Sequence, residues 1–528
     1  MKLYHHGQIL PMGGVPRAAA LLLDGPRIAA VGGLEELRRQ AGADCELVDL
    51  RGAAVLPGFI DGHGHFVQFA NSLRFVSLAG CTSFLQIQEA LDRHRRENGL
   101  SEADWLIGFG YDHNNLREGR HPTRVELDAV SRTNPILISH ASGHMGCVNS
   151  AALRAAGITA GTADPAGGRI ARDVAGEPTG YLEETAFMSL AAAAPQPTQE
   201  EMERLLRRAQ AVYFSYGITT AQEGLMKQPE FDLLRHAAET GALRLDVVGY
   251  ADIRDNAAIV AEHPDRFTYH GHFRLGGYKL FLDGSPQGRT AWVSKPYEQA
   301  DGQSADYCGY PIYETDQVRA YVEKAEREGR QLLTHCNGDA AIDQLLAAFE
   351  GPTVNRDVII HAQLLRKDQL PKVRALGLMP SYFAAHTWYW GDAHLRNFGP
   401  ERAGRISPLA STAALGIPFT LHQDTPVLPP DMLETVWCAV RRVTKGGVQL
   451  SESEAVSPMQ ALEAVTLNGA YQYFEEGDKG TLSPGKRADL VILEKDPTAV
   501  PADEIRGIAV LETVKDGETV YRRQQDTR

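Results

Sequence analysis

The feature that most constrains this chain is residues 55–66, which read VLPGFIDGHGHF. An apolar run typical of a buried strand leads directly into His63 and His65. Alternate side chains of an extended strand point to the same face, so the two imidazoles are expected to project together. Gly62 and Gly64 leave room around them, because glycine has no side chain. Two such imidazoles can bind one cation, provided that other parts of the chain supply further ligands.

Composition narrows the class of protein. The 528 residues include 43% hydrophobic and 23% charged residues, which is typical of a soluble globular chain. A formal net charge of −14 disfavours nucleic acid or an anionic membrane as the main partner. No apolar stretch approaches the roughly 20 residues of a membrane span, and the first residues lack the apolar core of a signal peptide. The six cysteines are scattered and form no CxxC motif, which favours a reduced, cytoplasmic protein. A homodimer is left open as a possible oligomeric state.

Eight apolar runs in the middle of the chain predict strands, and amphipathic stretches that predict helices separate most of them. The predicted strands are residues 55–61, 217–223, 243–250, 274–283, 330–336, 357–362, 377–383 and 417–424. Eight strands that alternate with helices predict an α/β protein with a (β/α)8 TIM barrel. A doubly wound open sheet is the alternative, and the placement of the candidate ligands argues against it.

The two ends of the chain are rich in short strand patterns. Asp24-Gly25 and Asp516-Gly517 are hairpin signals between apolar runs. Since neither end has enough strands to bury a core alone, both are expected to combine in one small β-sandwich. About 155 residues separate the first two barrel strands, against about 30 in an ordinary βαβ unit, which predicts a large insertion after barrel strand 1. The predicted domains are a barrel of residues 55–71 and 201–475, an insertion of residues 72–200, and a sandwich of residues 1–54 and 476–528.

Candidate metal ligands fall at the ends of the predicted barrel strands, where barrel enzymes carry their sites. Strand 1 supplies two histidines, strand 4 a lysine, strands 5 and 6 one histidine each, and strand 8 an aspartate. Neutral imidazole and carboxylate groups are the usual ligands of zinc-like divalent ions. The predicted ligands of one or two ions, with zinc preferred, are His63, His65, Lys279, His335, His361 and Asp424.

Lys279 decides the number of ions in this prediction. Two neighbouring cations repel each other, and a lysine can bridge them only as a carbamate, which forms when its neutral amine adds carbon dioxide. The alternatives for Lys279 are an unmodified cation that stabilises an oxyanion, or a salt bridge inside the barrel. A water held between metals ionises near neutral pH and can attack a carbonyl as hydroxide. Asp424 is then the candidate proton shuttle from that water to the leaving nitrogen.

Five segments carry a family resemblance: PGFIDGHGH, YKLFLDGS, HCNGDAAID, IIHAQ and FTLHQDTPV. Together with the C-terminal GTLSPGKRADLVIL, they resemble the amidohydrolase superfamily, and specifically its YtcJ-like branch, the amidohydrolase 3 family. The resemblance implies a barrel with a sandwich, a metal centre, and hydrolysis of C–N bonds in small molecules. The resemblance also implies a role for each candidate residue. The family's bridging lysine corresponds to Lys279 and its catalytic aspartate to Asp424. Its histidine ligands correspond to His63, His65, His335 and His361.

The residues that contact substrate are less constrained by the sequence. His144 lies in the segment SGHMG of the insertion, and its alternative role is to order a loop. Arg289 lies in a loop after barrel strand 4, where a surface salt bridge is the alternative. An aromatic run after strand 7 could line the site or pack against the insertion. The predicted substrate contacts are His144, Arg289, His386, Trp388, Tyr389 and Trp390.

These features together predict a metal-dependent hydrolase that cleaves the amide bond of an N-acyl or N-formyl amine, with a small molecule as its partner. Hydrolysis of a carbamate, ester or cyclic amide by the same hydroxide stays an alternative. A mononuclear deaminase on the same fold would need a glutamate near His335, but Cys336, Asn337, Gly338 and Asp339 follow it. A non-catalytic binding protein on a barrel is a further alternative, which the complete ligand set disfavours.

Overall fold

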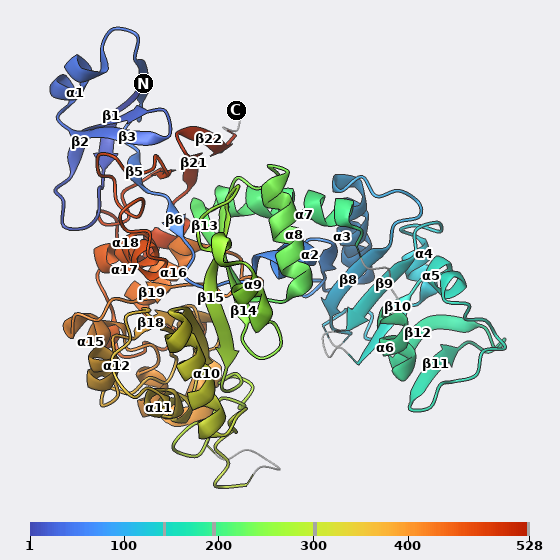
Figure 1. Cartoon of the computed structure of the whole chain (residues 1–528). Helices are drawn as coiled ribbons and strands as arrows, with labels where there is room; N and C mark the ends of the chain where they lie inside the picture. Colours follow the sequence, from blue (N-terminus) through green and yellow to red (C-terminus); the bar gives the residue numbers. More distant parts are fainter. Residues whose placement is uncertain (114, 141–143, 193–196, 299–303, 525–528) are drawn as a thin grey trace. The chain divides into compact units, whose positions relative to one another are not determined.

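The computed structural model of the chain describes residues 1–113, 115–140, 144–192, 197–298 and 304–524 (Figure 1). Two compact units divide the chain. The large unit contains Met1–Phe69 and Leu206–Arg528, and the inserted unit contains Ala70–Leu205. The inserted unit therefore interrupts the large unit in sequence, and its bounds overlap the insertion predicted at residues 72–200. No helix in the described ranges is long and apolar enough to cross a membrane.

One sheet of the large unit joins both ends of the chain. Within the described residues its strand order is β22-β21-β20-β5-β1-β2-β3, and β4 pairs with β1. Leu490 lies opposite Pro57 where β20 pairs with β5, so the C-terminal strands extend the N-terminal ones. Hydrogen bonds make this one continuous sheet, and the two-layered sandwich stays a prediction. The strands are β1 (Lys2–Ile9), β2 (Ala18–Asp24), β3 (Arg27–Gly32), β4 (Glu46–Asp49), β5 (Ala54–Pro57), β20 (Leu490–Leu493), β21 (Val510–Lys515) and β22 (Glu518–Arg522).

This terminal sheet buries apolar side chains from both chain ends in one core. Tyr4, Leu21, Val55, Leu490 and Val514 come from five different strands, and none of them is more than 2% exposed. The turns between β2 and β3 and between β21 and β22 are those that the two Asp-Gly signals predict. Because the core draws on strands from both ends, neither end buries it alone.

A second sheet of the large unit consists of parallel strands in chain order. The described strands follow the order β6-β13-β14-β15-β16-β17-β18-β19, and each pairs in parallel with the next. Parallel strands that alternate with helices are the repeating unit of TIM-barrel-like proteins. The bounds are β6 (Phe59–Ile60), β13 (Ile218–Met226), β14 (Asp246–Asp252), β15 (Phe273–Phe281), β16 (Gln331–Cys336), β17 (Val358–His361), β18 (Met379–Tyr382) and β19 (Thr420–Leu421).

The predicted first barrel strand, residues 55–61, is wrong in one respect. Ala54–Pro57 is β5 of the terminal sheet, and only Phe59–Ile60 pairs in the parallel sheet. The chain crosses from one sheet to the other at Gly58, where an added Cβ atom would lie 2.5 Å from the Thr219 side chain. A larger residue does not fit there without a shift of its neighbours. The parallel sheet therefore begins near residue 59 and not at residue 55.

The helices of the large unit bury one face each. In α10, Val318, Val322 and Ala325 are spaced by four and three residues and are buried, on a helix that contacts β16. Gly329 ends this helix in the left-handed conformation, with a φ of 60°. Helices α2 and α7 run across the boundaries between the two units. The α-helices are α1 (Leu34–Ala41), α2 (Phe66–Ser72), α7 (Gln199–Ser215), α8 (Gln228–Glu239), α9 (Ala257–Glu262), α10 (Thr315–Glu328), α11 (Asp339–Ala348), α12 (Leu370–Leu376), α13 (His386–Tyr389), α14 (Gly391–Gly404), α15 (Leu409–Ala414), α16 (Met432–Arg441), α17 (Pro458–Ala464) and α18 (Leu467–Gln472), and the 3-10 helices are η1 (Pro264–Phe267), η2 (Glu452–Glu454) and η3 (Ala502–Gly507).

The inserted unit has its own mixed sheet. Its described strands follow the order β11-β12-β10-β9-β8-β7, in which β7, β8 and β9 pair in parallel and the others are antiparallel. Asn149 caps α5, because its side chain accepts the N–H of Ala152. The elements are β7 (Phe75–Ser77), β8 (Leu106–Tyr111), β9 (Ile136–His140), β10 (Met145–Val148), β11 (Gly168–Arg172), β12 (Pro178–Glu184), α3 (Phe84–Glu97), α4 (Arg124–Asp128), α5 (Ser150–Ala155) and α6 (Thr185–Ala192).

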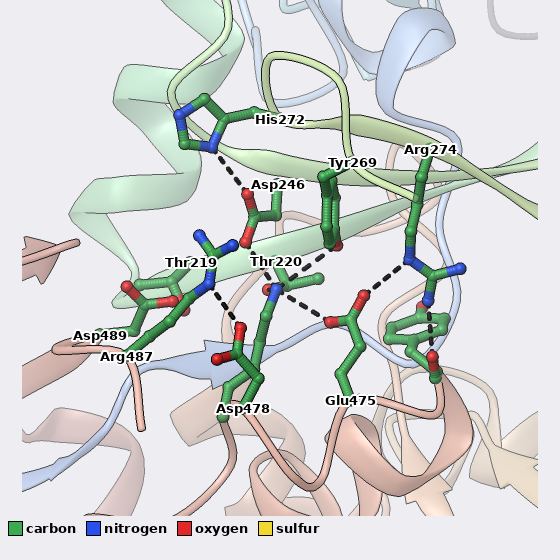
Figure 2. A network of polar contacts seen from close by, with 12 residues as sticks. Thr219, Thr220, Asp246, Tyr269, His272, Arg274, Glu475, Asp478, Arg487 and Asp489 are labelled. Carbon is green, nitrogen blue, oxygen red and sulfur yellow. Dashed lines mark hydrogen bonds and ion pairs between the residues drawn. The ribbon is translucent and has the colours of Figure 1, made fainter. Parts of the chain in front are cut away.

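A buried network of charged side chains lies at the amino-terminal ends of the parallel strands (Figure 2). Lys479 Nζ donates to Asp246 Oδ2 at 2.5 Å and lies 2.9 Å from Glu475 Oε2. Asp246 is the first residue of β14 and also bonds His272, whereas Arg274 Nε donates to Glu475 Oε1 at 2.7 Å. Although burial opposes ionisation, Lys479 holds the pKa of Asp246 well below its ordinary value. The network joins the strands to the segment after α18, at the strand ends opposite to the candidate ligands.

Candidate metal centre

The six predicted ligands all belong to the large unit and lie at or near the carboxyl ends of its parallel strands. The loops after β6 and β19 carry three of them, and β15, β16 and β17 each carry one within two residues of the strand end. Carboxyl ends of parallel strands meet at one edge of a sheet, which brings distant segments of the chain together. In strand order these residues are His63, His65, Lys279, His335, His361 and Asp424.

His63 and His65 converge on one carboxylate oxygen. Asp424 Oδ1 lies 3.5 Å from His63 Nε2 and 3.4 Å from His65 Nε2. The parallel pairing of β6 ends at Ile60, so strand alternation is not what aims the two imidazoles. The loop itself aims them, since His65 forms a backbone bridge with Glu223. The predicted convergence is present, but its structural cause differs from the predicted one.

A glutamine fixes which nitrogen of His63 faces the centre. Gln222 Nε2 donates to the Gly62 carbonyl at 3.1 Å and to the Tyr473 hydroxyl at 2.9 Å, so its Oε1 is an acceptor. His63 Nδ1 lies 2.5 Å from this Oε1 and therefore carries the proton, which leaves a lone pair on Nε2. Burial also lowers the pKa of His63 well below its ordinary value, so the ring is neutral. A neutral imidazole with its Nε2 lone pair toward Asp424 is the form that binds a metal ion.

Lys279 is fully buried beside this pair. Its Nζ lies 3.2 Å from His63 Nε2, and the side chain is 0% exposed. Burial lowers the pKa of Lys279 to about 7, even though Asp424 opposes the shift. A substantial fraction of its amine is therefore neutral near neutral pH. The neutral amine is the form that can add carbon dioxide.

His361 and His335 extend the centre on its other side. His361 Nε2 lies 3.9 Å from Asp424 Oδ2, and its Nδ1 lies 3.1 Å from His422 Nε2. His422 is held in turn by Ser381, whose Oγ lies 2.8 Å from His422 Nδ1. The ring of His335 lies 4.6 Å from that of His361, measured between centroids. Each of the six predicted ligands thus has another member of the set as a close neighbour.

Buried carboxyl groups surround the centre, and the sequence reasoning missed them. Asp61 Oδ1 accepts the backbone N–H of His63, and burial raises the pKa of Asp61 to about 8. Glu223 Oε1 lies 3.9 Å from His65 Nδ1, and burial raises its pKa to about 7. His335 Nδ1 lies 3.2 Å from the buried Asp283. The only sequence signal for these groups is a polar residue at or just after the end of an apolar strand run.

The donor set fits a divalent ion that prefers nitrogen and oxygen. One nitrogen each of His63 and His65 and one oxygen of Asp424 all lie within 4.8 Å of one another. Asp424 Oδ1 is buried and has no hydrogen-bond partner among the described residues. Buried polar atoms in folded proteins almost always have a partner, and a metal ion would supply one here. Ligands about 2.0–2.1 Å from a tetrahedral zinc ion lie about 3.3–3.4 Å apart, close to the two N–O distances of 3.5 and 3.4 Å.

The predicted aromatic run splits into two groups. Trp388 packs edge-on against Trp437 of α16, with 5.1 Å between ring centroids, and Tyr389 donates to Glu434 of the same helix at 3.1 Å. Both therefore pack within the large unit. Trp390 instead contacts Phe383, a residue whose ring lies 5.3 Å from that of His422.

The other three predicted substrate contacts occupy different surroundings. His386 is buried, with its Nδ1 3.0 Å from His394 Nε2 and its ring 4.7 Å from that of Phe383. Arg289 donates to the backbone carbonyl of Glu298 in the loop after β15. His144 belongs to the inserted unit, where its Nδ1 lies 3.1 Å from Glu184. Their roles toward a substrate stay predictions.

Comparison with known proteins extends over nearly the whole chain. Residues 46–521 match the model of the amidohydrolase family. The chain is 30% identical to N-substituted formamide deformylase from Arthrobacter pascens, over 96% of this chain and 95% of that protein. It is 29% identical to the putative amidohydrolase YtcJ from Bacillus subtilis, over 96% of each. An uncharacterized metal-dependent hydrolase from Pyrococcus furiosus matches in structure with a TM-score of 0.73 and 25% identity, over 94% of this chain and 99% of that one.

These matches confirm the predicted family resemblance. They cover both units, so the inserted unit belongs to the shared architecture. The strand order, the matched family and the structural relative agree on a TIM-barrel-like α/β fold. The chain belongs to the amidohydrolase family, and it is a hydrolase that acts on carbon–nitrogen bonds.

Proposed function

We propose that this enzyme hydrolyses the amide bond of small N-acyl or N-formyl amines with a divalent metal ion, preferably zinc. The observation that carries the proposal is the convergence of His63 Nε2 and His65 Nε2 on Asp424 Oδ1, at 3.5 and 3.4 Å. The similarity to a protein named N-substituted formamide deformylase supports the N-formyl class of substrate. The ligand set is His63, His65, Lys279, His335, His361 and Asp424 on a closed (β/α)8 barrel.

A divalent ion at such a site polarises a carbonyl and lowers the pKa of a water. The protein's own contribution begins with Asp424. Burial alone would raise the pKa of Asp424, but the nearby His65 lowers it below its ordinary value, so this group is a carboxylate at neutral pH. A carboxylate can accept a proton from water and then donate it to the leaving nitrogen. The product pair is a carboxylic acid and an amine.

Lys279 sets the number of ions in this proposal. Its neutral amine adds carbon dioxide, so that an N–C bond forms, one proton is released, and an anionic carbamate results. His63 and His65 would hold one ion and His335 and His361 a second, and the negative charge of the carbamate would offset the repulsion between the two cations. Support comes from the 3.2 Å distance between Lys279 Nζ and His63 Nε2 and from the lowered pKa of Lys279.

Substrate choice is assigned to residues outside the ligand set. Trp390 and His386 both contact Phe383, which connects them through ring contacts to His361 and His422. They are the stronger candidates for contact with an apolar amine. The candidates Arg289, Trp388, Tyr389 and His144 rest on sequence position alone.

The test is a matched panel of substrates with zinc-loaded enzyme. Formanilide, acetanilide and phenyl formate share one aromatic group, and they differ in the acyl group or in the bond that is cleaved. We expect release of aniline from at least one of the amides, and a loss of about 100-fold or more in the Asp424→Asn variant. Cleavage of the ester alone would refute amide hydrolysis. Wild-type turnover by Asp424→Asn would refute the proton-transfer role.

A further inference from the structure

The inserted unit contains a second cluster of imidazole and carboxylate groups. Asp112 and His113 directly follow β8, and His140 is the last residue of β9. β8 and β9 are neighbouring parallel strands, and Tyr111 at the end of β8 pairs with His140. The three side chains therefore lie together at the carboxyl ends of adjacent strands. This is the kind of strand edge at which α/β proteins collect ligand-binding groups.

The distances within this cluster fit metal coordination, and one of them also fits a hydrogen bond between the two imidazoles. His113 Nδ1 lies 3.3 Å from His140 Nε2, and Asp112 Oδ1 lies 3.4 Å from His140 Nε2 and 3.8 Å from His113 Nδ1. Typical N–H···O hydrogen bonds are shorter, at about 2.7–3.2 Å. The ligands of a tetrahedral zinc ion lie about 3.3–3.4 Å apart, which fits two of the three distances. The first two distances also resemble the N–O separations of His63 and His65 from Asp424.

Neighbouring aromatic groups hold the imidazoles in this arrangement. The ring of His113 stacks on that of His121 at 4.0 Å, and His121 stacks on Tyr181 at 4.3 Å. The hydroxyl of Tyr111 lies 2.9 Å from His121 Nδ1, and its ring meets that of His140 edge-on at 5.4 Å. Preorganised ligands lose little conformational freedom when an ion binds, which favours binding.

We propose that Asp112, His113 and His140 form a second binding site, in the inserted unit, for a divalent ion of the zinc type. Two imidazoles and one carboxylate suit zinc, cobalt or nickel rather than magnesium or calcium, which prefer oxygen ligands. The side chains are 32%, 29% and 10% exposed, so water reaches the cluster and can occupy a fourth position. The ion joins the ends of β8 and β9 and stabilises the inserted unit.

A third group of histidine and aspartate side chains lacks the fixed ring geometry of the cluster in the inserted unit, and we do not propose a metal site there. His5, His6 and Asp49 also offer atoms within 4.8 Å of one another. The side chains of His6 and Asp49 are 62% and 51% exposed, and solvent competes strongly for groups of that kind. Among the described residues, the only ring in contact with that of His6 is the ring of His5, at 4.3 Å. This surface group lacks the stacked rings that surround His113, and the site is assigned to the inserted unit for that reason.

The test counts zinc in the full-length protein. Metal-free wild type and variants are loaded with zinc sulfate, freed of loose ion by gel filtration, and assayed for zinc by plasma emission. We expect His113→Ala and Asp112→Asn each to hold one ion per chain fewer than wild type. His144→Ala is the matched control, because it removes an exposed histidine from the same unit and should not change the zinc content. When His113→Ala or Asp112→Asn is added to a His63→Ala/His65→Ala protein, its zinc content should likewise fall by one ion per chain.

Two outcomes would overturn the second site. Equal zinc content in wild type and in the nearly isosteric Asp112→Asn would do so, even if His113→Ala failed to fold. An equal loss in His144→Ala would show that the drop reflects general damage to the unit. Zinc should also raise the melting temperature of the His63→Ala/His65→Ala protein, and His113→Ala should reduce that shift. These readouts do not use amide hydrolysis, so a failure of the proposed function leaves them intact.

Discussion

Gln222 offers the sharpest test of how the protein prepares its metal centre. The substitution Gln222→Met keeps the volume of a buried side chain but removes the acceptor for His63 Nδ1 and both donors of the amide. His63 can then carry its proton on Nε2, where it blocks the lone pair that faces Asp424. Groups that orient a ligand in this way change metal affinity by about 10–100-fold. We therefore expect metal binding to weaken by about 1.4–2.7 kcal/mol.

The cost to folding stability should be small, because two of the three partners of Gln222 keep another bond. The Gly62 carbonyl still accepts from Gln472 Nε2 at 2.8 Å, and the Tyr473 hydroxyl still donates to the Asp61 carbonyl at 2.6 Å. Only His63 Nδ1 loses its bond, and one unsatisfied buried polar group costs about 1–3 kcal/mol. The free energy of unfolding of the metal-free protein should fall by about that amount.

The control is Gln472→Met, the same substitution at a neighbouring buried glutamine. The side chain of Gln472 bonds the Gly62 carbonyl and Thr420, and among the described residues it forms no hydrogen bond with His63. Chelator competition should show a weaker zinc affinity for Gln222→Met and an unchanged affinity for Gln472→Met. Gln222→Glu should recover much of the affinity, since a carboxylate also accepts from Nδ1–H. Equal zinc affinity in wild type and Gln222→Met would refute the orienting role.

Two further predictions concern Lys279 and the buried network at the other end of the strands. With bicarbonate present, the wild-type protein should hold close to two metal ions per chain at the centre in the large unit. The Lys279→Ala variant should hold fewer. Equal metal contents in the two proteins would argue against a carbamate bridge. At a fixed bicarbonate concentration, the effect of bicarbonate should grow as the pH rises through about 7 and then level off, because the amine is then mostly neutral. Asp246→Asn should lower the free energy of unfolding at pH 7 by about 3–5 kcal/mol, because Lys479 and Lys515 lose a buried anion. Because the pKa of Asp246 in the folded protein lies below its ordinary value, the stability that its carboxylate provides should be lost as the pH falls. In urea unfolding, the difference in unfolding free energy between wild type and Asp246→Asn should therefore shrink below about pH 4. A difference that stays constant with pH would contradict this prediction.

The positions of the six candidate ligands could be predicted because they depend on local pattern. Each lies at or near the carboxyl end of an apolar run, and parallel strands bring such ends to one edge. The crossing between the two sheets at Gly58 could not be predicted in the same way. Ala54–Pro57 and Phe59–Ile60 are both fully buried, so they read as one apolar strand although they belong to different sheets. The close approach of Gly58 to Thr219 separates them, and it depends on a residue about 160 positions away.

The groups that orient the ligands are beyond sequence pattern for a related reason. Gln222 and Glu223 lie in β13, far along the chain from the histidines that they contact. A buried glutamine in a strand reads equally well as an edge residue or a turn. His422 precedes Asp424 by two residues and is recognisable only once its contact with His361 is known. Pairing between distant segments, and not residue type, gives these side chains their roles.

The cluster of Asp112, His113 and His140 in the inserted unit could not be predicted from the sequence for the same reason. His113 and His140 are separated by 26 residues and by no repeated motif, and nothing in the sequence marks β8 and β9 as parallel neighbours. Once the strands are paired, their carboxyl ends bring imidazoles and a carboxylate together, as the parallel sheet of the large unit does for His63, His65 and Asp424. The two clusters differ in how the rings are held: Gln222 holds His63 by a hydrogen bond, and His121 holds His113 by stacking. A hydrogen bond fixes the tautomer, whereas stacking fixes only the plane of the ring. Zinc should therefore bind more weakly at the second site, in the inserted unit, than at His63, His65 and Asp424.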